Sequence, residues 1–244
     1  MSSPRRIRSL FTLPNIPMTK GPSQTSFFQT TCRTYASSSQ DATQNLPPAA
    51  RTPPKKKIVV AMTGATGAIL GIKLLKALRR LSVETHLVMS KWAEATIKYE
   101  TDFQPLDIRS LADHCYGVRE QSAPISSGSF RADGMIVVPC SMKTLASIRM
   151  GYSDDLISRA ADVMLKERRK LVLAVRETPL SDIHLENMLS LTRSGAVIFP
   201  PVPAWYTRPR DIGEMEDQSV GRMLDMFQLD TGDFERWEGF KWKK

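Results

Sequence analysis

The sequence predicts a single three-layer α/β/α domain, in which a mostly parallel sheet lies between two layers of helices. Three observations support this fold class. Short, almost wholly apolar segments alternate with longer segments whose apolar residues recur every three to four positions. Strands that are apolar on both faces belong to sheets covered on both sides. The apolar segments end in small, polar or charged residues, as in Rossmann-like and flavodoxin-like folds.

The predicted elements follow one another from residue 57 onward. Strands are expected over KIVVAM (57–62), ETHLVMS (84–90), GMIVVPC (134–140), LVLAVRE (171–177) and AVIF (196–199). Helices are expected over ILGIKLLKALRRL (69–81), KWAEATIKYE (91–100), SMKTLASIRM (141–150), DLISRAADVMLKERR (155–169), IHLENMLSLTRSG (183–195) and within GEMEDQSVGRMLDMF (213–227). Ligands of such sheets bind at the carboxyl ends of the strands, so the site is expected there.

The positive charge of the chain is concentrated before the predicted domain. The whole sequence has a net charge of +9, and residues 1–57 hold nine Lys or Arg against the single acid Asp41, which leaves +1 for the remainder. A domain this close to neutral is not expected to bind nucleic acid. Residues 1–35 are rich in Ser, Thr and Arg and contain no acid, which predicts a mitochondrial transit peptide and a matrix location.

Three further features limit the class of protein. Residues 36–56 are rich in Pro, Ser, Gln and Ala and predict a flexible linker, so the folded domain is expected over 57–244. No apolar run approaches the ~20 residues of a membrane span, and no membrane association is predicted. The cysteines show neither a disulfide framework nor a zinc-binding spacing, and His86, His114 and His184 lack ligand spacing, so no metal is predicted.

A glycine-containing turn follows the first predicted strand. Its sequence TGATGA (63–68) is G-x-x-G rather than the G-x-G-x-x-G of a dinucleotide site. The first amides of the following helix are expected to face an anion or acceptor atom. Ser90 and the run Ser141, Lys143 and Thr144 repeat a hydroxyl-bearing helix start on two further strands, which favours a phosphate-bearing cofactor. Taken singly, each hydroxyl is also explained as a helix cap.

Charged and aromatic residues near the end of the chain form a second set. Arg176 and Glu177 end an apolar strand, where an ion would be half-buried unless it meets a ligand or partner. PPVPAWYTRP (200–209) is a rigid turn with Tyr206, and Arg222 lies on the last predicted helix. A planar, permanently charged guanidinium suits a phosphate or an electron-rich ring.

These residues resemble a known family. TGATGAILGIKLL, ETHLVMSKWA, VVPCSMKTLASI, RAADVMLKERRKLVLAVRETPL and GAVIFPPVPAWYTRP occur in the order found in UbiX-type flavin prenyltransferases, which include the fungal proteins called phenylacrylic acid decarboxylases. The similarity spans about residues 57–237. It implies metal-free transfer of a dimethylallyl group from its monophosphate to nitrogen-5 and carbon 6 of reduced FMN. The product, prenylated FMN, would serve a UbiD-type decarboxylase of aromatic or cinnamic acids.

The resemblance also implies residue roles and an assembly. The expected FMN contacts are Gly64, Ala65, Thr66, Ser90, Ser141, Met142, Lys143, Thr144 and Arg176. The expected catalytic and prenyl-phosphate residues are Arg159, Lys166, Glu177, Tyr206 and Arg222, with Glu100 as a further acid and Thr66 near the reaction centre. Relatives form dodecamers, so Arg159 and Lys166 are expected to act on a neighbour's flavin.

Three points stay open from the sequence. Thr66 stands where bacterial relatives usually have Ser, so the choice between monophosphate and diphosphate donors is not settled. One alternative is an FMN-dependent cysteine decarboxylase, although its catalytic His and PxMN segment are not recognisable here. The other is a flavin-binding regulatory subunit without catalysis, against which the joint presence of Lys166, Glu177, Tyr206 and Arg222 argues.

Overall fold

A computed structural model describes residues 55–239 of the 244-residue chain. The chain divides into two units, Met1–Arg51 and Thr52–Lys244, and the described residues all belong to the second. The predicted transit peptide over 1–35 and all but the last two residues of the predicted linker over 36–56 lie outside the described residues. The first described strand begins at Lys57, where the domain is expected to start.

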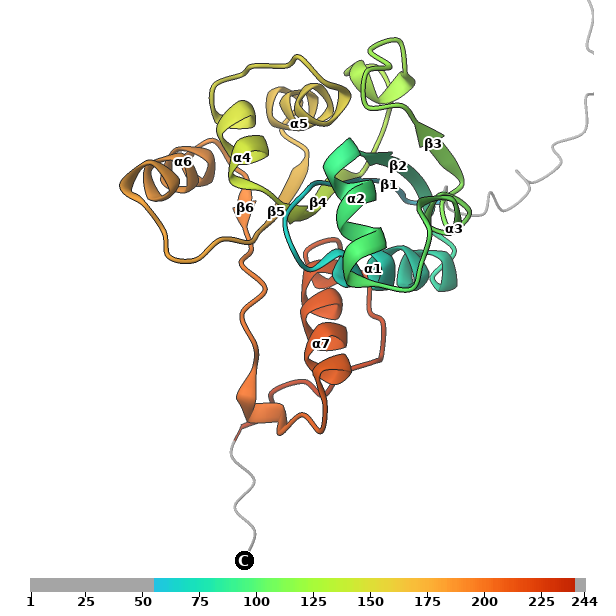
Figure 1. The fold of residues 1–244 in the computed structure, drawn as a ribbon, viewed down its shortest axis with the longest axis vertical. Coiled ribbons are helices and arrows are strands. Elements are labelled where there is room, and N and C mark those ends of the chain that lie inside the picture. Colours follow the sequence, from blue (N-terminus) through green and yellow to red (C-terminus); the bar gives the residue numbers. More distant parts are fainter. Residues whose placement is uncertain (1–54, 240–244) are drawn as a thin grey trace, which may run out of the picture. The chain divides into compact units, whose positions relative to one another are not determined.

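The described residues form one six-stranded sheet in which every pairing is parallel, with the order β3-β2-β1-β4-β5-β6 (Figure 1). The strands are β1 (Lys57–Met62), β2 (Glu84–Met89), β3 (His114–Tyr116), β4 (Gly134–Cys140), β5 (Lys170–Val175) and β6 (Val197–Ile198). The α-helices are α1 (Ala68–Arg80), α2 (Lys91–Glu100), α3 (Pro105–Arg109), α4 (Met142–Arg149), α5 (Leu156–Lys166), α6 (Asp182–Arg193) and α7 (Ile212–Asp225), with short 3₁₀ turns η1 (Pro124–Ser126) and η2 (Trp205–Thr207). This strand order is that of a Rossmann-type sheet, which confirms the predicted fold class.

Strand β3 and helix α3 are absent from the elements that the sequence predicts. β3 has only three residues at the edge of the sheet, and two of them are exposed, so no apolar run marks it. α3 has five residues, too few for a helical repeat of apolar positions to be recognised. Both additions extend the β2 side of the sheet and leave the predicted parallel core unchanged.

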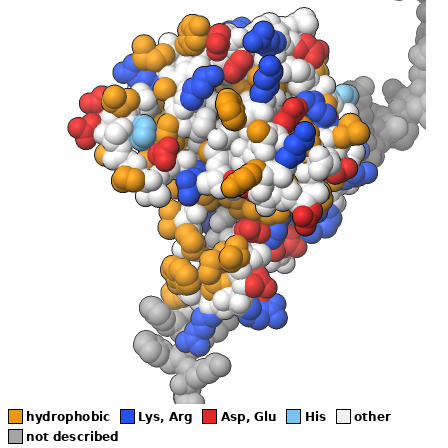
Figure 2. All heavy atoms as spheres, in the orientation of Figure 1, with side chains coloured by type: hydrophobic (Ala, Val, Ile, Leu, Met, Phe, Trp, Pro, Cys, Tyr) orange, Lys and Arg blue, Asp and Glu red, His pale blue; other side chains and the backbone are white. Residues whose placement is uncertain are grey.

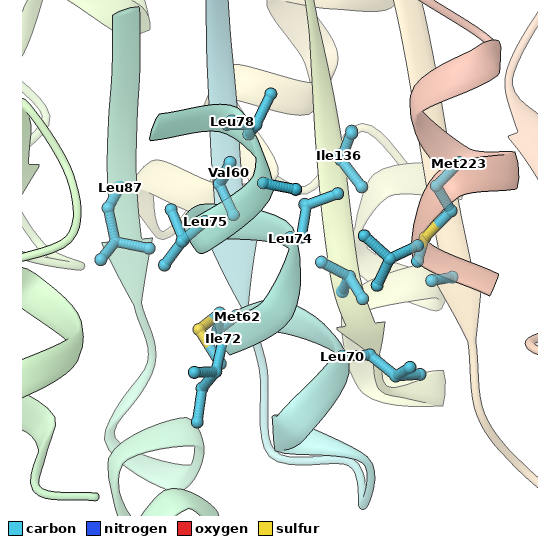
Figure 3. Packing of buried hydrophobic residues seen from close by; sticks show 14 of the residues in the cluster. Val60, Met62, Leu70, Ile72, Leu74, Leu75, Leu78, Leu87, Ile136 and Met223 are labelled. Carbon is cyan, nitrogen blue, oxygen red and sulfur yellow. The ribbon is translucent and has the colours of Figure 1, made fainter. Parts of the chain in front are cut away.

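One face of the sheet packs against α1, α2, α3 and α7. Alternate residues of β1, such as Val60 and Met62, point to this face and meet Leu74 and Leu75 of α1 (Figure 3). α7 adds Met223 to the same cluster. The contact between α1 and α7 also includes a polar group, because Lys73 Nζ lies 3.0 Å from a Glu216 oxygen and 2.9 Å from an Asp217 oxygen. The C-terminal helix is therefore part of the sheet's cover.

The opposite face packs against α4, α5, α6 and η1. Val59 and Ala61 of β1 point to this face, where they join buried residues of α5 such as Ala160 and Val163. Every residue of β4 is buried, as expected for a strand covered on both sides. The complete burial of Cys140 in β4 raises the pKa of its thiol to about 12, so it behaves as an apolar core residue.

Among the described residues, no helix combines the length and the apolar character needed to cross a membrane.

Candidate functional site

Four strands bring polar residues to the carboxyl edge of the sheet. β1 is followed by the loop Thr63–Gly67, β2 by Ser90, β4 by Ser141, and β5 by Arg176 and Glu177. The strand order reverses between β1 and β4, since the chain proceeds from β1 to β2 and β3 on one side and from β4 to β5 and β6 on the other. Ligands of parallel sheets bind outside such a switch point. The residues predicted for FMN thus converge on this edge.

Thr63 joins the two strands at the switch point. Its side-chain hydroxyl donates to the carbonyl of Pro139 at 2.7 Å and accepts the backbone N–H of Ser141 at 2.8 Å. Its own backbone N–H also donates to Pro139 at 3.2 Å, and only 2% of the residue is exposed. Sequence reasoning assigned Thr63 no role, because a threonine after a strand gives no sign of the partner strand that it meets.

The loop after β1 is narrow because α2 lies against it. A Cβ atom added to Gly64 would lie 2.3 Å from the Cβ of Trp92, a separation that folded proteins do not show. Gly67 has φ of +97°, a left-handed conformation that glycine adopts without strain. The first glycine is therefore required by close approach and the second by backbone conformation.

The amides at the start of α1 do not point at an open site, which corrects one sequence-based expectation. Glu100 Oε2 accepts hydrogen bonds from the N–H groups of Gly67 at 2.9 Å and Ala68 at 3.0 Å. A carboxylate at this position satisfies unpaired amides and interacts favourably with the helix dipole. Glu100 thus lies next to the glycine loop, as expected of a residue near the site, and at least one of its oxygens caps α1.

The two serine-bearing helix starts have similar geometry. Ser90 Oγ accepts the N–H of Ala93 at 3.1 Å, and Ser141 Oγ accepts the N–H of Thr144 at 3.4 Å. The hydroxyls of Ser141 and Thr144 are 3.2 Å apart. Both serines are therefore helix caps, and both remain half-exposed at the carboxyl edge. Met142 is half-exposed and Lys143 is exposed on the first turn of α4.

Arg176 and Glu177 are exposed rather than half-buried, so the expected desolvation of this pair does not occur in the described chain. The backbone N–H of Arg176 donates to the carbonyl of Cys140 at 3.2 Å, which fixes the residue beside β4. Glu177 Oε1 accepts only a local hydrogen bond, from the N–H of Thr178 at 3.1 Å. Both side chains extend from the carboxyl edge, where a ligand can reach them.

Arg159 and Lys166 lie in the first and last turns of α5. Arg159 donates to the carbonyl of Ser126 at 3.0 Å and to Asp162 at 2.7 Å. Lys166 forms an ion pair with Glu167 at the end of α5. Strand β5 begins four residues later at Lys170, which lies opposite Gly134, the first residue of β4. Lys166 is therefore near the amino edge of the sheet, opposite the predicted FMN residues of its own chain.

Tyr206 and Arg222 also lie outside the cluster at the carboxyl edge. After β6 the chain leaves the sheet toward η2, where Tyr206 is exposed and its ring meets Trp237 edge-on at 5.4 Å (Figure 1). Arg222 is near the end of α7. This end of the helix lies toward the start of β1, because the carbonyl of Phe227, two residues after α7, accepts a hydrogen bond from Lys56 Nζ at 2.5 Å. The described chain thus brings the predicted FMN residues together with Glu177, but not with Lys166, Tyr206 or Arg222.

A separate cluster lies at the amino edge of the sheet and was missed by the sequence reasoning. The pairing of β2 with β3 sets His86 opposite His114, and their potential ligand atoms lie within 4.8 Å of Glu84 and of each other, so these histidines do have ligand spacing in the fold. His86 also meets the Tyr116 hydroxyl at 2.9 Å. Lys57 Nζ is 2.9 Å from Glu84 Oε1, so an ammonium group already balances this carboxylate.

Comparison with known proteins identifies the class of this α/β domain. The family model described as Flavoprotein matches residues 48–229, most of the chain. The chain therefore belongs to the Flavoprotein family, in agreement with a site at the carboxyl edge of a parallel sheet.

Two similar relatives narrow the class. The chain is 64% identical over 196 residues to the mitochondrial flavin prenyltransferase PAD1 of Saccharomyces cerevisiae, which covers 80% of this chain and 81% of the yeast protein. It is 57% identical over 190 residues to a probable UbiX-like flavin prenyltransferase of Bacillus subtilis, covering 78% of this chain and 93% of that protein. These matches place the chain among the UbiX-type flavin prenyltransferases and confirm the resemblance stated above.

Solved structures agree with this assignment. AnUbiX (PadA1), crystallised with FMN and dimethylallyl pyrophosphate, is 72% identical with a TM-score of 0.76, covering 77% of this chain and all of the other. A dodecameric FMN-dependent UbiX-like protein of Escherichia coli O157:H7 is 58% identical with a TM-score of 0.74, covering 75% of this chain and all of the other. A PPC decarboxylase variant is 17% identical with a TM-score of 0.55 and shares the fold alone.

Proposed function

We propose that the chain transfers a dimethylallyl group from dimethylallyl monophosphate to nitrogen-5 and carbon 6 of reduced FMN, and that a UbiD-type decarboxylase takes up the prenylated FMN. The high identity to flavin prenyltransferases supports this function most directly, and the residues predicted to contact FMN lie together at the carboxyl edge. The chain would thus act as an enzyme that makes a cofactor for another enzyme.

The carboxyl edge suits FMN by shape and by donor chemistry. The close approach of Trp92 to Gly64 leaves no room for a side chain on the first loop glycine, so a flat ring bound at this residue would meet backbone atoms rather than a side chain. Hydroxyls of Thr66, Ser90 and Ser141 border the loop, and Arg176 supplies a permanent positive charge. When bound, reduced FMN supplies the nucleophilic ring atoms of the reaction.

The chain's own charged residues would act on the prenyl donor. Arg159, Lys166 and Arg222 are cations that can neutralise the phosphate as its ester bond to the allyl carbon breaks. The ring of Tyr206 offers an aromatic face to the developing allyl cation. Glu177 at the carboxyl edge can donate a proton to the departing phosphate or accept one from the flavin ring.

Turnover is tested by mass spectrometry of the flavin. Purified protein is incubated without oxygen with reduced FMN and either dimethylallyl monophosphate or the pyrophosphate, and a flavin heavier by one five-carbon unit is expected with the monophosphate. Glu177→Gln should retain FMN, as measured by flavin absorbance, but lose prenylation. Glu186→Gln, the same change at an exposed glutamate of α6, controls for lost charge. Unmodified FMN with both donors would contradict the proposal.

We also propose a homo-oligomer, a dodecamer as in the relative from E. coli, because Lys166, Tyr206 and Arg222 lie apart from the carboxyl edge of their own chain, where Glu177 lies with the predicted FMN residues. Many large apolar side chains are exposed, including Trp92, Tyr99, Trp205 and Ile183. Figure 2 shows hydrophobic side chains, in orange, at several places on one face of the molecule. Such a surface is typical of one that other subunits cover. Subunit packing would then bring Lys166 of one copy to Glu177 of another.

Mixed oligomers test whether the site is shared between subunits. Lys166→Ala and Glu177→Gln chains are inactive alone under this proposal, but co-assembly in equal amounts should restore about a quarter of the wild-type activity, because sites that combine two intact residues then form by chance. If both residues served the site of their own chain, no mixture would contain an intact site. Light scattering on each variant checks that assembly is unchanged.

The matrix location is proposed from the acid-free, arginine-bearing segment 1–35, and the yeast relative carries the label mitochondrial. A reporter protein fused to residues 1–56 should enter isolated mitochondria and be shortened there. A fusion that lacks residues 1–35, and with them four of the five arginines of residues 1–56, is the control and should stay outside the mitochondria. Import of both fusions alike would contradict the proposal.

A further inference from the structure

Asp225 is held by two arginines at the end of α7. Arg222, one helical turn earlier, donates to Asp225 Oδ2 at 2.7 Å. Arg236 reaches the same carboxylate from the C-terminal segment and uses both oxygens, with Nη1 3.0 Å from Oδ2 and Nη2 2.8 Å from Oδ1. The Asp225 side chain is only 14% exposed, whereas those of Arg222 and Arg236 are 44% and 45% exposed. The carboxylate is thus largely covered and the two guanidinium groups reach solvent.

The position of the C-terminal segment is set by a glycine next to Arg222. A Cβ atom on Gly221 would lie 2.2 Å from the ring of Phe234, so the ring occupies the space that any larger residue would fill. The Arg236 guanidinium lies over the same ring, 4.9 Å from its centre. The packing of Phe234 on Gly221 therefore positions Arg236 next to Asp225.

The arrangement affects the charge that Arg222 can offer. An arginine paired with one aspartate forms a neutral group, which attracts a phosphate weakly. The second guanidinium makes a two-point contact with the carboxylate, a strong form of ion pair, and gives the group of Arg222, Asp225 and Arg236 a net charge of +1. Asp230, which also accepts from Arg236 at 2.9 Å, has a side chain 68% exposed, so solvent screens its charge.

A second contact connects the same segment to the predicted prenyl-phosphate residues. Trp237 follows Arg236 directly, and its ring meets that of Tyr206 at 76°. The C-terminal segment therefore contacts Tyr206 of η2 directly, through Trp237, and is connected to Arg222 of α7 through Asp225.

We propose that Asp225 holds the Arg222 guanidinium until the prenyl donor binds, and that Arg236 is a positioning residue whose two-point contact weakens the hold of this carboxylate on Arg222, so that Arg222 can turn to the phosphate of the donor. When Arg222 turns to the phosphate, Asp225 stays paired. This inference rests on the proposed function, in which Arg222 binds that phosphate.

The test measures binding and turnover separately in the FMN-loaded full-length chain. Calorimetry with dimethylallyl monophosphate should show about tenfold weaker binding for Arg236→Gln, with a parallel rise in KM and a kcat within about twofold of wild type. Arg236→Lys keeps the charge but loses the two-point contact, and should therefore recover only part of the affinity. In an Asp225→Asn background Arg236→Gln should have no further effect on binding, because the carboxylate that competes for Arg222 is gone.

A matched control separates this role from general loosening of the segment. Arg80 of α1 pairs with Asp233 of the same segment and does not contact Asp225 in the described structure. Arg80→Gln should therefore leave donor affinity within about twofold of wild type. Equal losses in Arg80→Gln and Arg236→Gln, or an undiminished Arg236→Gln effect beside Asp225→Asn, would overturn the inference. If the wild type neither binds the donor nor prenylates FMN, the proposed function itself fails, and this inference with it.

Discussion

Replacing Thr63 with Val tests whether one hydroxyl ties the two central strands together at the switch point. Valine has nearly the shape of threonine, so the substitution creates no cavity. It removes the hydroxyl that donates to Pro139 and accepts from Ser141, both within 2.8 Å. The N–H of Ser141 would lose its acceptor, while the Pro139 carbonyl would keep the backbone N–H of residue 63.

The expected loss of stability follows from these contacts. The Ser141 N–H is only part-buried, so leaving it without a partner costs about 1 kcal/mol, the low end for an unpaired group, and the lost hydrogen bond to Pro139 adds about 0.5–1.5 kcal/mol. Thr63→Val should therefore lower the free energy of unfolding by about 1.5–2.5 kcal/mol. At about 2–4 °C per kcal/mol for a domain of this size, Tm should fall by about 3–10 °C.

The assay is urea unfolding of the FMN-free protein at one fixed protein concentration, because assembly and ligand binding both shift apparent stability. Thr63→Ser is the control: it keeps the hydroxyl and loses one buried methyl group, at a cost of about 1 kcal/mol. The slope of the unfolding free energy against urea should match wild type in both variants. The reasoning is refuted if Thr63→Val is no less stable than Thr63→Ser.

Three further outcomes are expected. Gly64→Ala should weaken FMN binding, measured by flavin fluorescence, by at least about tenfold because the new methyl group meets Trp92, and Trp92→Gly in the same chain should restore part of the affinity. Burial lowers the pKa of His86 below that of an unfolded histidine, so the contribution of His86 to the free energy of unfolding is complete above the unfolded pKa and is lost as the pH falls below it. The decrease in Tm from pH 7.5 to 5.5 should therefore be smaller in His86→Gln than in wild type. An equal decrease in the two proteins would contradict this reasoning. Glu100→Gln keeps an acceptor at the start of α1 but removes its charge, so it should destabilise by about 0.3–1 kcal/mol in thermal unfolding, while a loss of several kcal/mol would show a different role.

The architecture was predictable because each long element has a pattern of its own. The strands at the centre of the sheet are buried on both faces and read as continuous apolar runs, as in the completely buried β4. The short edge elements β3 and α3 carry no such pattern, since their residues are few and partly exposed. Length and burial thus decide which elements a sequence reveals.

The site was predictable in part. Residues that follow strands, such as Ser90 and Ser141, were located because parallel strands end at one edge. Contacts between distant segments left no sign in the sequence: Glu100 at the start of α1, Thr63 beside Pro139, and the two histidines of neighbouring strands depend on strand pairing and helix placement. The roles assigned to the individual site residues stay predictions.

The predicted prenyl-phosphate cations share a property that bears on how such a site can be built. Arg159 pairs with Asp162, Lys166 with Glu167 and Arg222 with Asp225, each within one helical turn. Three cations gathered beside one another without a ligand would repel and would each lose hydration. In the described chain Arg159 and Lys166 are two helical turns apart on α5 and Arg222 is on α7, and each is partly exposed beside a local carboxylate, which avoids that cost until assembly and substrate bring an opposing charge. A phosphate that enters the proposed site must then compete with those carboxylates for the cations. A second cation that binds one of the carboxylates, as Arg236 binds Asp225, weakens this competition and should therefore raise the affinity for the substrate.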